Sequence, residues 1–259
     1  MKFRHRCGPV KIARRRLRQW YDKHLGKTLQ NAEKEHLDEI LPDMFGYYLI
    51  QMGYPYSASL LESSRISHRI VIDIDQIEDK TVSLCATASQ LPVATDSIDV
   101  LLLPHTLELE EDPHQVLREA DRILIPEGHI IIVGFNPFGF WGVWRKILSR
   151  LGEPPWCGRF YSVSRLKDWL SLLGFETIEV RKFFHRPPCR NEILLRRLGF
   201  IEKMGRVLWP WFSGVYILVA KKQVFTLTPI KNRKLNGAKL FPKRIVEPSS
   251  RVMRNDSKS

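Results

Sequence analysis

The chain has 259 residues, of which 44% are hydrophobic, and a formal net charge of +13. This length and hydrophobic content suit one sizeable core with extensions, and no apolar run reaches the roughly eighteen residues that a membrane-spanning helix needs. The positive charge sits at the two ends. Residues 1–27 and 221–259 carry +9 each, so the residues between them carry −5 of the total.

The basic ends allow two interpretations. They could contact nucleic acid or an anionic membrane through charge alone, or they could be solvated tails. Residues 1–20 contain no apolar stretch of the kind found in a secretory signal, so we expect none. We expect a basic extension over residues 1–18, one domain over 19–222, and a mostly disordered tail over 223–259.

The cysteines show no metal-binding pattern. Cys7, Cys85, Cys157 and Cys189 form no CxxC pair, and neither they nor the eight histidines have zinc-ligand spacing. We therefore expect free thiols in a reducing, cytoplasmic compartment, and no metal site.

The first part of the chain reads as helix followed by strands. Residues 1–18 are rich in arginine and are either disordered or the start of a helix, and apolar residues then recur at helical spacing from Trp20 to Leu41. Apolar runs follow that are typical of buried strands, at residues 47–53, 69–75 and 82–85, with a short helix expected over 55–64.

The most informative stretch runs from Ser97 to Pro137. A buried strand over residues 98–103 is followed by a helical pattern with Asp112 as the N-cap, which we expect to end near Pro126. A second buried strand follows over residues 130–133. This is a strand–helix–strand unit, and its crossover should be right-handed.

The last third of the chain predicts a helix over residues 165–173 capped by Ser164, a strand over 175–180, an amphipathic helix over 193–209 and a final strand over 215–220. Aromatic residues cluster between Phe135 and Trp144. They either bury one another or face a flat or lipidic acceptor, or an anionic membrane interface.

The stretch around residues 97–137 resembles the centre of class I S-adenosylmethionine-dependent methyltransferases of the type 11 kind. The matching residues, in order, are Ile98-Asp99, Leu107-Glu108, Asp112-Pro113, Leu117-Arg118-Glu119-Ala120 and Arg122-Ile123-Leu124 with Pro126 and Gly128. The whole chain also resembles a group of proteobacterial proteins of this family. The resemblance implies a Rossmann-like α/β fold with a mostly parallel central sheet, a final antiparallel strand and helices on both faces.

The resemblance also implies S-adenosylmethionine as the cofactor, and it places the cofactor-binding residues. The family has a Gly-x-Gly-x-Gly loop after the first strand, whereas this chain keeps only Gly53 and continues Tyr54-Pro55-Tyr56-Ser57. The loop either binds the cofactor in an altered way, or no longer binds it, or takes a different cofactor.

An acidic residue at the end of the second strand would accept hydrogen bonds from the ribose hydroxyls. Asp73 is our first choice and Asp75 the second. Thr87 stands where the family has an aspartate that accepts from the adenine amino group, and the Ala88 amide could meet an adenine ring nitrogen. Leu103 ends the strand beside this site.

His105 follows the strand that ends at Leu103, at the sheet edge where open α/β sheets bind ligands. It is the candidate catalytic residue, as a general base or as an orienting hydrogen-bond partner, unless it is simply packed on the loop.

Together these features favour a methyltransferase acting on an acceptor, expected to be a small molecule, that the sequence leaves open. Two alternatives stay open. One is a non-catalytic relative that uses its basic ends to contact RNA, membrane or protein, and the other is a nucleic-acid-modifying enzyme. An Asn/Asp-Pro-Pro-Tyr/Phe motif, typical of many amino-directed nucleic-acid methyltransferases, is absent from the sequence.

Overall fold

The computed structural model describes residues 8–53, 60–75, 82–148, 155–188 and 212–223. The chain divides into two compact units, residues 1–225 and 226–259, and every described residue belongs to the first. The predicted helix over residues 193–209 and the residues Tyr54 to Ser57 of the altered loop lie outside the described residues.

A seven-stranded sheet in the order β3-β2-β1-β4-β5-β7-β6 organises the first unit. All neighbouring strands pair in parallel except β7, which pairs antiparallel with β5 on one side and β6 on the other. This confirms the predicted fold class. The strands are β1 (Tyr48–Met52), β2 (His68–Asp73), β3 (Leu84–Cys85), β4 (Ile98–Pro104), β5 (Leu124–Phe135), β6 (Phe175–Phe183) and β7 (Val215–Lys222).

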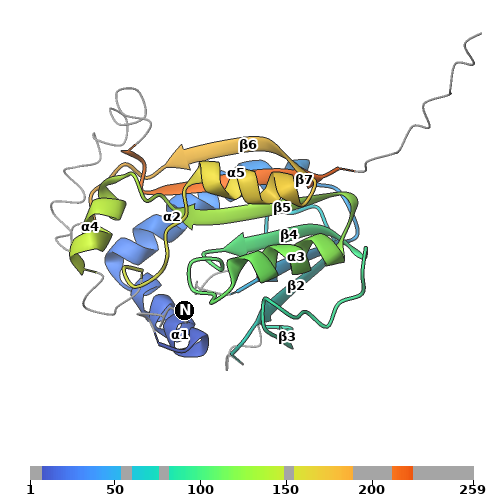
Figure 1. The fold of residues 1–259 in the computed structure, drawn as a ribbon, viewed down its shortest axis with the longest axis horizontal. Coiled ribbons are helices and arrows are strands. Elements are labelled where there is room, and N and C mark those ends of the chain that lie inside the picture. The colour runs from blue at the N-terminus through green and yellow to red at the C-terminus, as the bar shows by residue number, and fades with distance from the viewer. Residues whose placement is uncertain (1–7, 54–59, 76–81, 149–154, 189–211, 224–259) are drawn as a thin grey trace, which may run out of the picture. The chain divides into compact units, whose positions relative to one another are not determined.

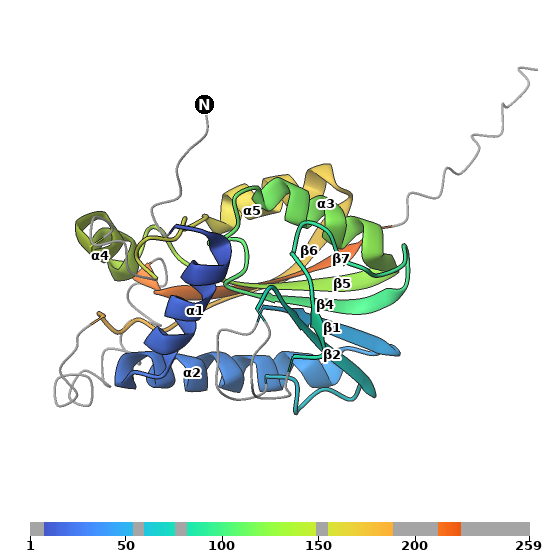
Figure 2. The same cartoon turned by 90° about the horizontal axis from the view of Figure 1, so that it is seen from below.

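Helices cover both faces of this sheet. The helices are α1 (Val10–Tyr21), α2 (His24–Ile40), α3 (Pro113–Ile123), α4 (Phe140–Leu148) and α5 (Val163–Leu172), with a short 3₁₀ turn at Leu41–Asp43. α3 and α5 lie on one face and α2 on the other (Figures 1 and 2). α1 and α4 lie beyond the carboxyl ends of the parallel strands, where this fold binds ligands (Figure 1).

The alternation of side chains along the strands builds two cores. In β4, Val100 and Leu102 point into the core under α1 and α2, whereas Leu101 and Leu103 point into the core under α3 and α5. Because both faces are covered, the central strands are apolar on both sides, which is the pattern that the sequence displayed.

The predicted strand–helix–strand unit is present, with one correction. Asp112 caps α3 by accepting hydrogen bonds from the amides of His114 and Gln115. The helix ends at Ile123, however, and not near Pro126. Leu124 already pairs with Ile98, and a shift in register lets β5 continue past this point.

Two further expectations differ in detail. Ser162, and not Ser164, caps α5 by accepting from the Arg165 amide. Residues 60–64, the described part of the helix expected over residues 55–64, form a turn. The aromatic residues Phe140, Trp141 and Trp144 lie in helix α4.

Helix α1 contains most of the arginine-rich segment. It runs across the expected boundary between the extension and the domain, at residues 18 and 19, and buries Ala13, Leu17, Trp20 and Tyr21 in the core. From Val10 onward the arginine-rich segment is thus helical, the second of the two alternatives that the sequence left open.

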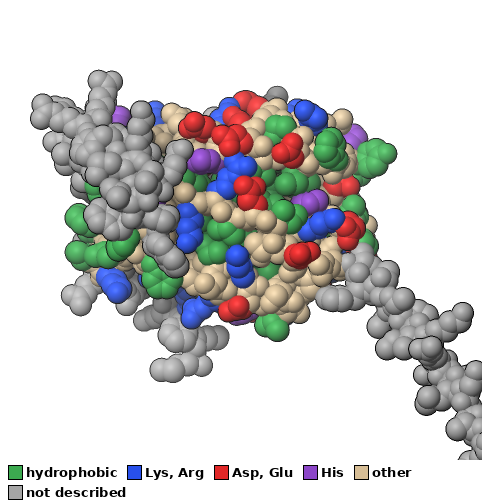
Figure 3. Space-filling view, turned by 90° about the horizontal axis from the view of Figure 1, so that it is seen from above, with side chains coloured by type: hydrophobic (Ala, Val, Ile, Leu, Met, Phe, Trp, Pro, Cys, Tyr) green, Lys and Arg blue, Asp and Glu red, His purple; other side chains and the backbone are tan. Residues whose placement is uncertain are grey.

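The expectation of four free thiols is wrong for Cys157, which is disulfide-bonded, while Cys85 is a free, exposed thiol. Among the described helices, none has the length and apolar character needed to cross a membrane. Acidic and basic side chains are interspersed on the face shown in Figure 3, consistent with a positive charge concentrated in the two end segments.

Asp99, one of the residues that carried the family resemblance, joins β4 to the start of β1. Its Oδ2 accepts hydrogen bonds of 2.8 Å from the amides of Tyr47 and Tyr48.

We expect Asp99→Ala to lower the free energy of unfolding by about 1–2 kcal/mol, because two amides lose a charged acceptor. Urea denaturation measures this. The matched control is Glu111→Ala, at an exposed acid, which should change stability by less than about 0.5 kcal/mol. Equal effects of the two substitutions would contradict the role of Asp99.

Candidate functional site at the carboxyl edge of the sheet

β1 and β2 end side by side, and the residues that follow them form the base of the candidate site. The Gly53 amide donates to the Ile72 carbonyl over 2.7 Å, and Gly53 has φ +92, in the left-handed region that favours glycine. A Cβ atom at Gly53 would lie 2.6 Å from Arg14 Nη1 and 3.1 Å from Thr106 Oγ1. The backbone conformation therefore favours glycine here, and any side chain at this position would also displace the end of the Arg14 side chain.

Asp73, the last residue of β2, is fully buried next to this glycine. Its Oδ1 accepts from the Ile74 amide over 2.7 Å. Two guanidinium groups of α1 also reach it, Arg14 Nη1 at 3.4 Å from Oδ1 and Arg18 Nη2 at 3.4 Å from Oδ2.

Arg14 links Asp73 to a second acid. Its Nη2 donates to Glu110 Oε1, in the loop after β4, over 2.7 Å. Only 6% of Arg14 is exposed, and its Nε is buried without a hydrogen-bond partner. A buried donor without a partner costs free energy. The contacts with Asp73 and Glu110 must therefore hold the guanidinium in place.

Asp75 is also engaged by α1, though closer to the surface. Lys11 Nζ lies 3.0 Å from Asp75 Oδ1, and Arg15 Nε lies 4.0 Å from Oδ2. Four basic residues of α1 therefore face Asp73, at the end of β2, and Asp75, two residues later.

These basic residues are not evident as site residues from the sequence, although a signal is present. Positions 11, 14, 15 and 18 follow the three- and four-residue spacing that places side chains on one face of a helix. The sequence alone does not show that this helix face meets Asp73 and Asp75. These four basic residues therefore indicate only a positively charged N-terminal segment.

The other predicted cofactor-binding residues lie on the loop after β3 and near the end of β4. The Ala86 amide donates to the Asp73 carbonyl, so Thr87 and Ala88 lie on the loop next to Asp73. Thr87 is exposed and Ala88 is buried. Leu103 packs into the core under α3 and α5.

His105 is enclosed between two carboxylates and is only 1% exposed. Its Nε2 lies 2.9 Å from Glu33 Oε1 of α2, and its Nδ1 lies 3.0 Å from Glu108 Oε2. Glu108 also accepts from the Phe135 amide over 2.5 Å, and the Tyr21 hydroxyl donates to Glu33 over 3.3 Å. The backbone of His105 is left-handed, with φ +49.

These contacts determine the charge of His105. Burial opposes the charged form, but the carboxylates of Glu108 and Glu33 outweigh it and raise the pKa of His105 to about 10. His105 is then an imidazolium at neutral pH with both nitrogens donating. A group in that state has no lone pair to accept a proton, so the geometry favours an orienting role over a general base.

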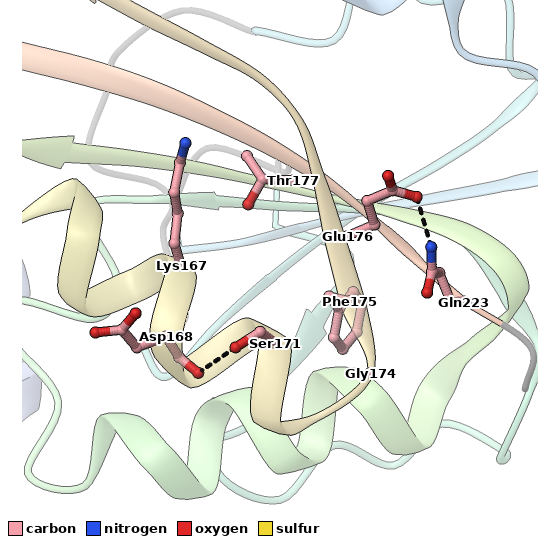
Figure 4. Close-up of a pocket in the computed structure, with 8 residues that line it drawn as sticks. All are labelled: Lys167, Asp168, Ser171, Gly174, Phe175, Glu176, Thr177 and Gln223. Carbon is pink, nitrogen blue, oxygen red and sulfur yellow. Dashed lines mark hydrogen bonds between the residues drawn. The ribbon is translucent and has the colours of Figure 1, made fainter.

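The described residues also line a pocket that lies away from Gly53, Asp73 and His105. A pocket of about 460 Å³ sits between α5 and the strands β6 and β7, where the Gln223 side chain donates to Glu176 over 2.6 Å (Figure 4). It borders the start of β6 and the end of β7, at the opposite end of the sheet from Gly53 and Asp73. In the described ranges, no group of three His, Cys, Asp or Glu side chains is arranged to hold a metal ion.

The raised pKa of His105 predicts a pH dependence of stability. The protonated state is favoured by folding, so its contribution is fully present below about pH 6.5 and is lost as the pH rises toward 10. His105→Gln should lower the free energy of unfolding by about 3–5 kcal/mol at pH 6, because two buried carboxylates lose their cation.

Denaturation curves between pH 6 and 10 test this. The gap in stability between wild type and His105→Gln should narrow as the pH rises, while His68→Gln, at an exposed histidine, should follow the wild type throughout. A gap that stays constant would show that folding does not favour the imidazolium form of His105.

The family profile described as "Methyltransferase domain" matches residues 56–132, which contain Asp73, the Thr87–Ala88 loop and His105. The uncharacterized protein YafS of Escherichia coli K12 is 33% identical over 218 residues, covering 83% of this chain and 85% of YafS.

Two solved structures share the fold. A SAM-dependent methyltransferase from Thermotoga maritima superposes with a TM-score of 0.54 at 18% identity, over 72% of this chain and 87% of that one. A SAM-dependent methyltransferase from Archaeoglobus fulgidus gives 0.51 at 20% identity, over 73% and 92%. These two structures share the fold and its sheet order. The match to the methyltransferase profile and to YafS identifies the chain as a member of the class I S-adenosylmethionine-dependent methyltransferase family.

Proposed function

We propose that the chain is an S-adenosylmethionine-dependent methyltransferase whose cofactor site is the edge formed by Gly53, Asp73 and the Thr87–Ala88 loop. The observation that carries this proposal is the buried Asp73 carboxylate at the end of β2, next to a left-handed glycine at the end of β1. A carboxylate there can accept from both hydroxyls of a ribose.

The family's cofactor fits these residues only in part. Asp73 supplies the acceptor for the ribose, Gly53 the bare backbone, and the Ala88 amide a donor for the adenine. The space above Gly53 does not fit, because the Arg14 guanidinium fills it and Arg14 and Arg18 contact the same carboxylate. This arrangement of α1 is therefore not one in which the cofactor can rest on the Gly53 backbone.

We propose a small-molecule acceptor. Buried aromatic side chains pack at the carboxyl end of β5, where Phe135 stacks on Trp141 with ring centroids 5.4 Å apart and on Phe160 at 5.0 Å. α4 begins directly beside them. An edge covered in this way favours an acceptor small enough to enter between helices.

A non-catalytic relative is the second candidate, and one observation favours it. The carboxylate that would hold the ribose already has cationic partners from the same chain. In such a protein, the ion pairs would serve only to hold α1 on the sheet.

Calorimetric titration with S-adenosylmethionine and S-adenosylhomocysteine tests the proposed site. We expect Asp73→Asn to weaken binding by about tenfold or more, because the ribose loses charged hydrogen bonds. Asp75→Asn is the matched control and should change the affinity little if Asp73 is the ribose ligand. Equal affinities of wild type and Asp73→Asn would contradict the assignment, and a loss confined to Asp75→Asn would move it to that residue.

A further inference from the structure

Helix α1 places cationic side chains where the ligand of this fold binds, and the contacts are specific. Arg14 bridges two buried acids from different parts of the chain, Asp73 after β2 and Glu110 after β4. Arg18, with 19% of its side chain exposed, reaches the second oxygen of Asp73. Both Asp73 oxygens therefore lie against guanidinium groups.

The guanidinium of Arg14 occupies space as well as carrying charge. A single carbon added at Gly53 would already lie 2.6 Å from Nη1. A ligand resting on the Gly53 backbone would need that same volume, because non-bonded carbon atoms pack best at about 3.5–4.0 Å. Cofactor and Arg14 therefore exclude each other above Gly53.

The remaining contacts of α1 differ in kind. Ala13, Leu17, Trp20 and Tyr21 hold the helix through packing, and the Trp20 ring lies 5.9 Å from that of Trp141. The contacts with the site are ionic, and two of them, at 3.4 Å, are long for charged hydrogen bonds. The Arg14 Nε is left without a partner. Arg14, called the plug below, is thus incompletely hydrogen-bonded in this position. Other donors could therefore replace it at Asp73.

We propose that α1 is an autoinhibitory element in which Arg14, supported by Arg18, stands in for the donor groups of the cofactor at Asp73, so that cofactor binding requires α1 to move or Arg14 to withdraw. This inference rests on the proposed function, since it needs Asp73 to be the ribose ligand. The residues Asp22 and Lys23, which join α1 to α2, are where the helix would pivot.

If only the open molecules bind, the apparent affinity is the intrinsic affinity multiplied by the fraction of molecules that are open. Removing the plug should therefore tighten binding. We expect Arg14→Ala to lower the Kd for S-adenosylhomocysteine by about tenfold or more, and Arg18→Ala to lower it by less, because Arg18 contacts Asp73 without filling the space at Gly53. Arg16→Ala is the matched control. It removes the same charge from an exposed position of the same helix and should leave the Kd unchanged.

Calorimetry on the full chain separates the outcomes. If wild type and both variants bind equally, the plug is disproved and the proposed cofactor site stands. Weaker binding by Arg14→Ala would make Arg14 a ligand of the cofactor and would equally disprove the plug. If the wild type, Arg14→Ala and Arg18→Ala all fail to bind at millimolar ligand, the proposed function fails, and the plug with it.

Hydrogen exchange on the wild-type chain gives a second readout that requires no substitution of Arg14. Saturating S-adenosylhomocysteine should speed amide exchange in residues 10–21 if the ligand displaces α1. Slower exchange there would mean that α1 closes over the ligand, and would overturn the proposal.

Discussion

A buried imidazolium holds the centre of this fold together. His105 lies between Glu33 and Glu108, so one imidazolium pairs with two side-chain carboxyl groups. The Tyr21 hydroxyl and the Phe135 amide donate further hydrogen bonds to those carboxyl groups. Because a buried charge needs all of its partners, this cluster fixes helices α1 and α2, the loop after β4 and the end of β5 relative to one another.

Pairing of buried acids with cations also occurs at Asp73. There the acids lie on the sheet edge and the cations on a helix, so attraction between them holds α1 across the edge. α1 belongs to both clusters, through Tyr21 at its end and Arg14 near its start. Any movement of Arg14 away from Asp73 is therefore mechanically linked to the residues that surround His105.

The sequence was informative wherever the physics was local. Apolar runs predicted the central strands. Asp112 predicted the start of α3, because N-capping depends only on the next three residues. The end of α3 was less predictable, since Leu124 leaves the helix to pair with Ile98, a contact between residues far apart in the chain. The candidate site divides in the same way. Gly53 and Asp73 could be named from their places after strands, whereas the charge on His105 depends on Glu33, 72 residues away, and Asp73 meets Arg14 only after the sheet has formed.

The position of β7 has a consequence for the order of assembly. This strand lies between β5 and β6, and it supplies the hydrogen bonds that join them. β6 is synthesised before β7 and has no direct partner in β5, so it stays unpaired until residues 215–222 are available. A growing chain can thus complete the strands from β3 to β5 early. The far side of the sheet closes only when the last strand inserts, in a single step that joins three strands at once.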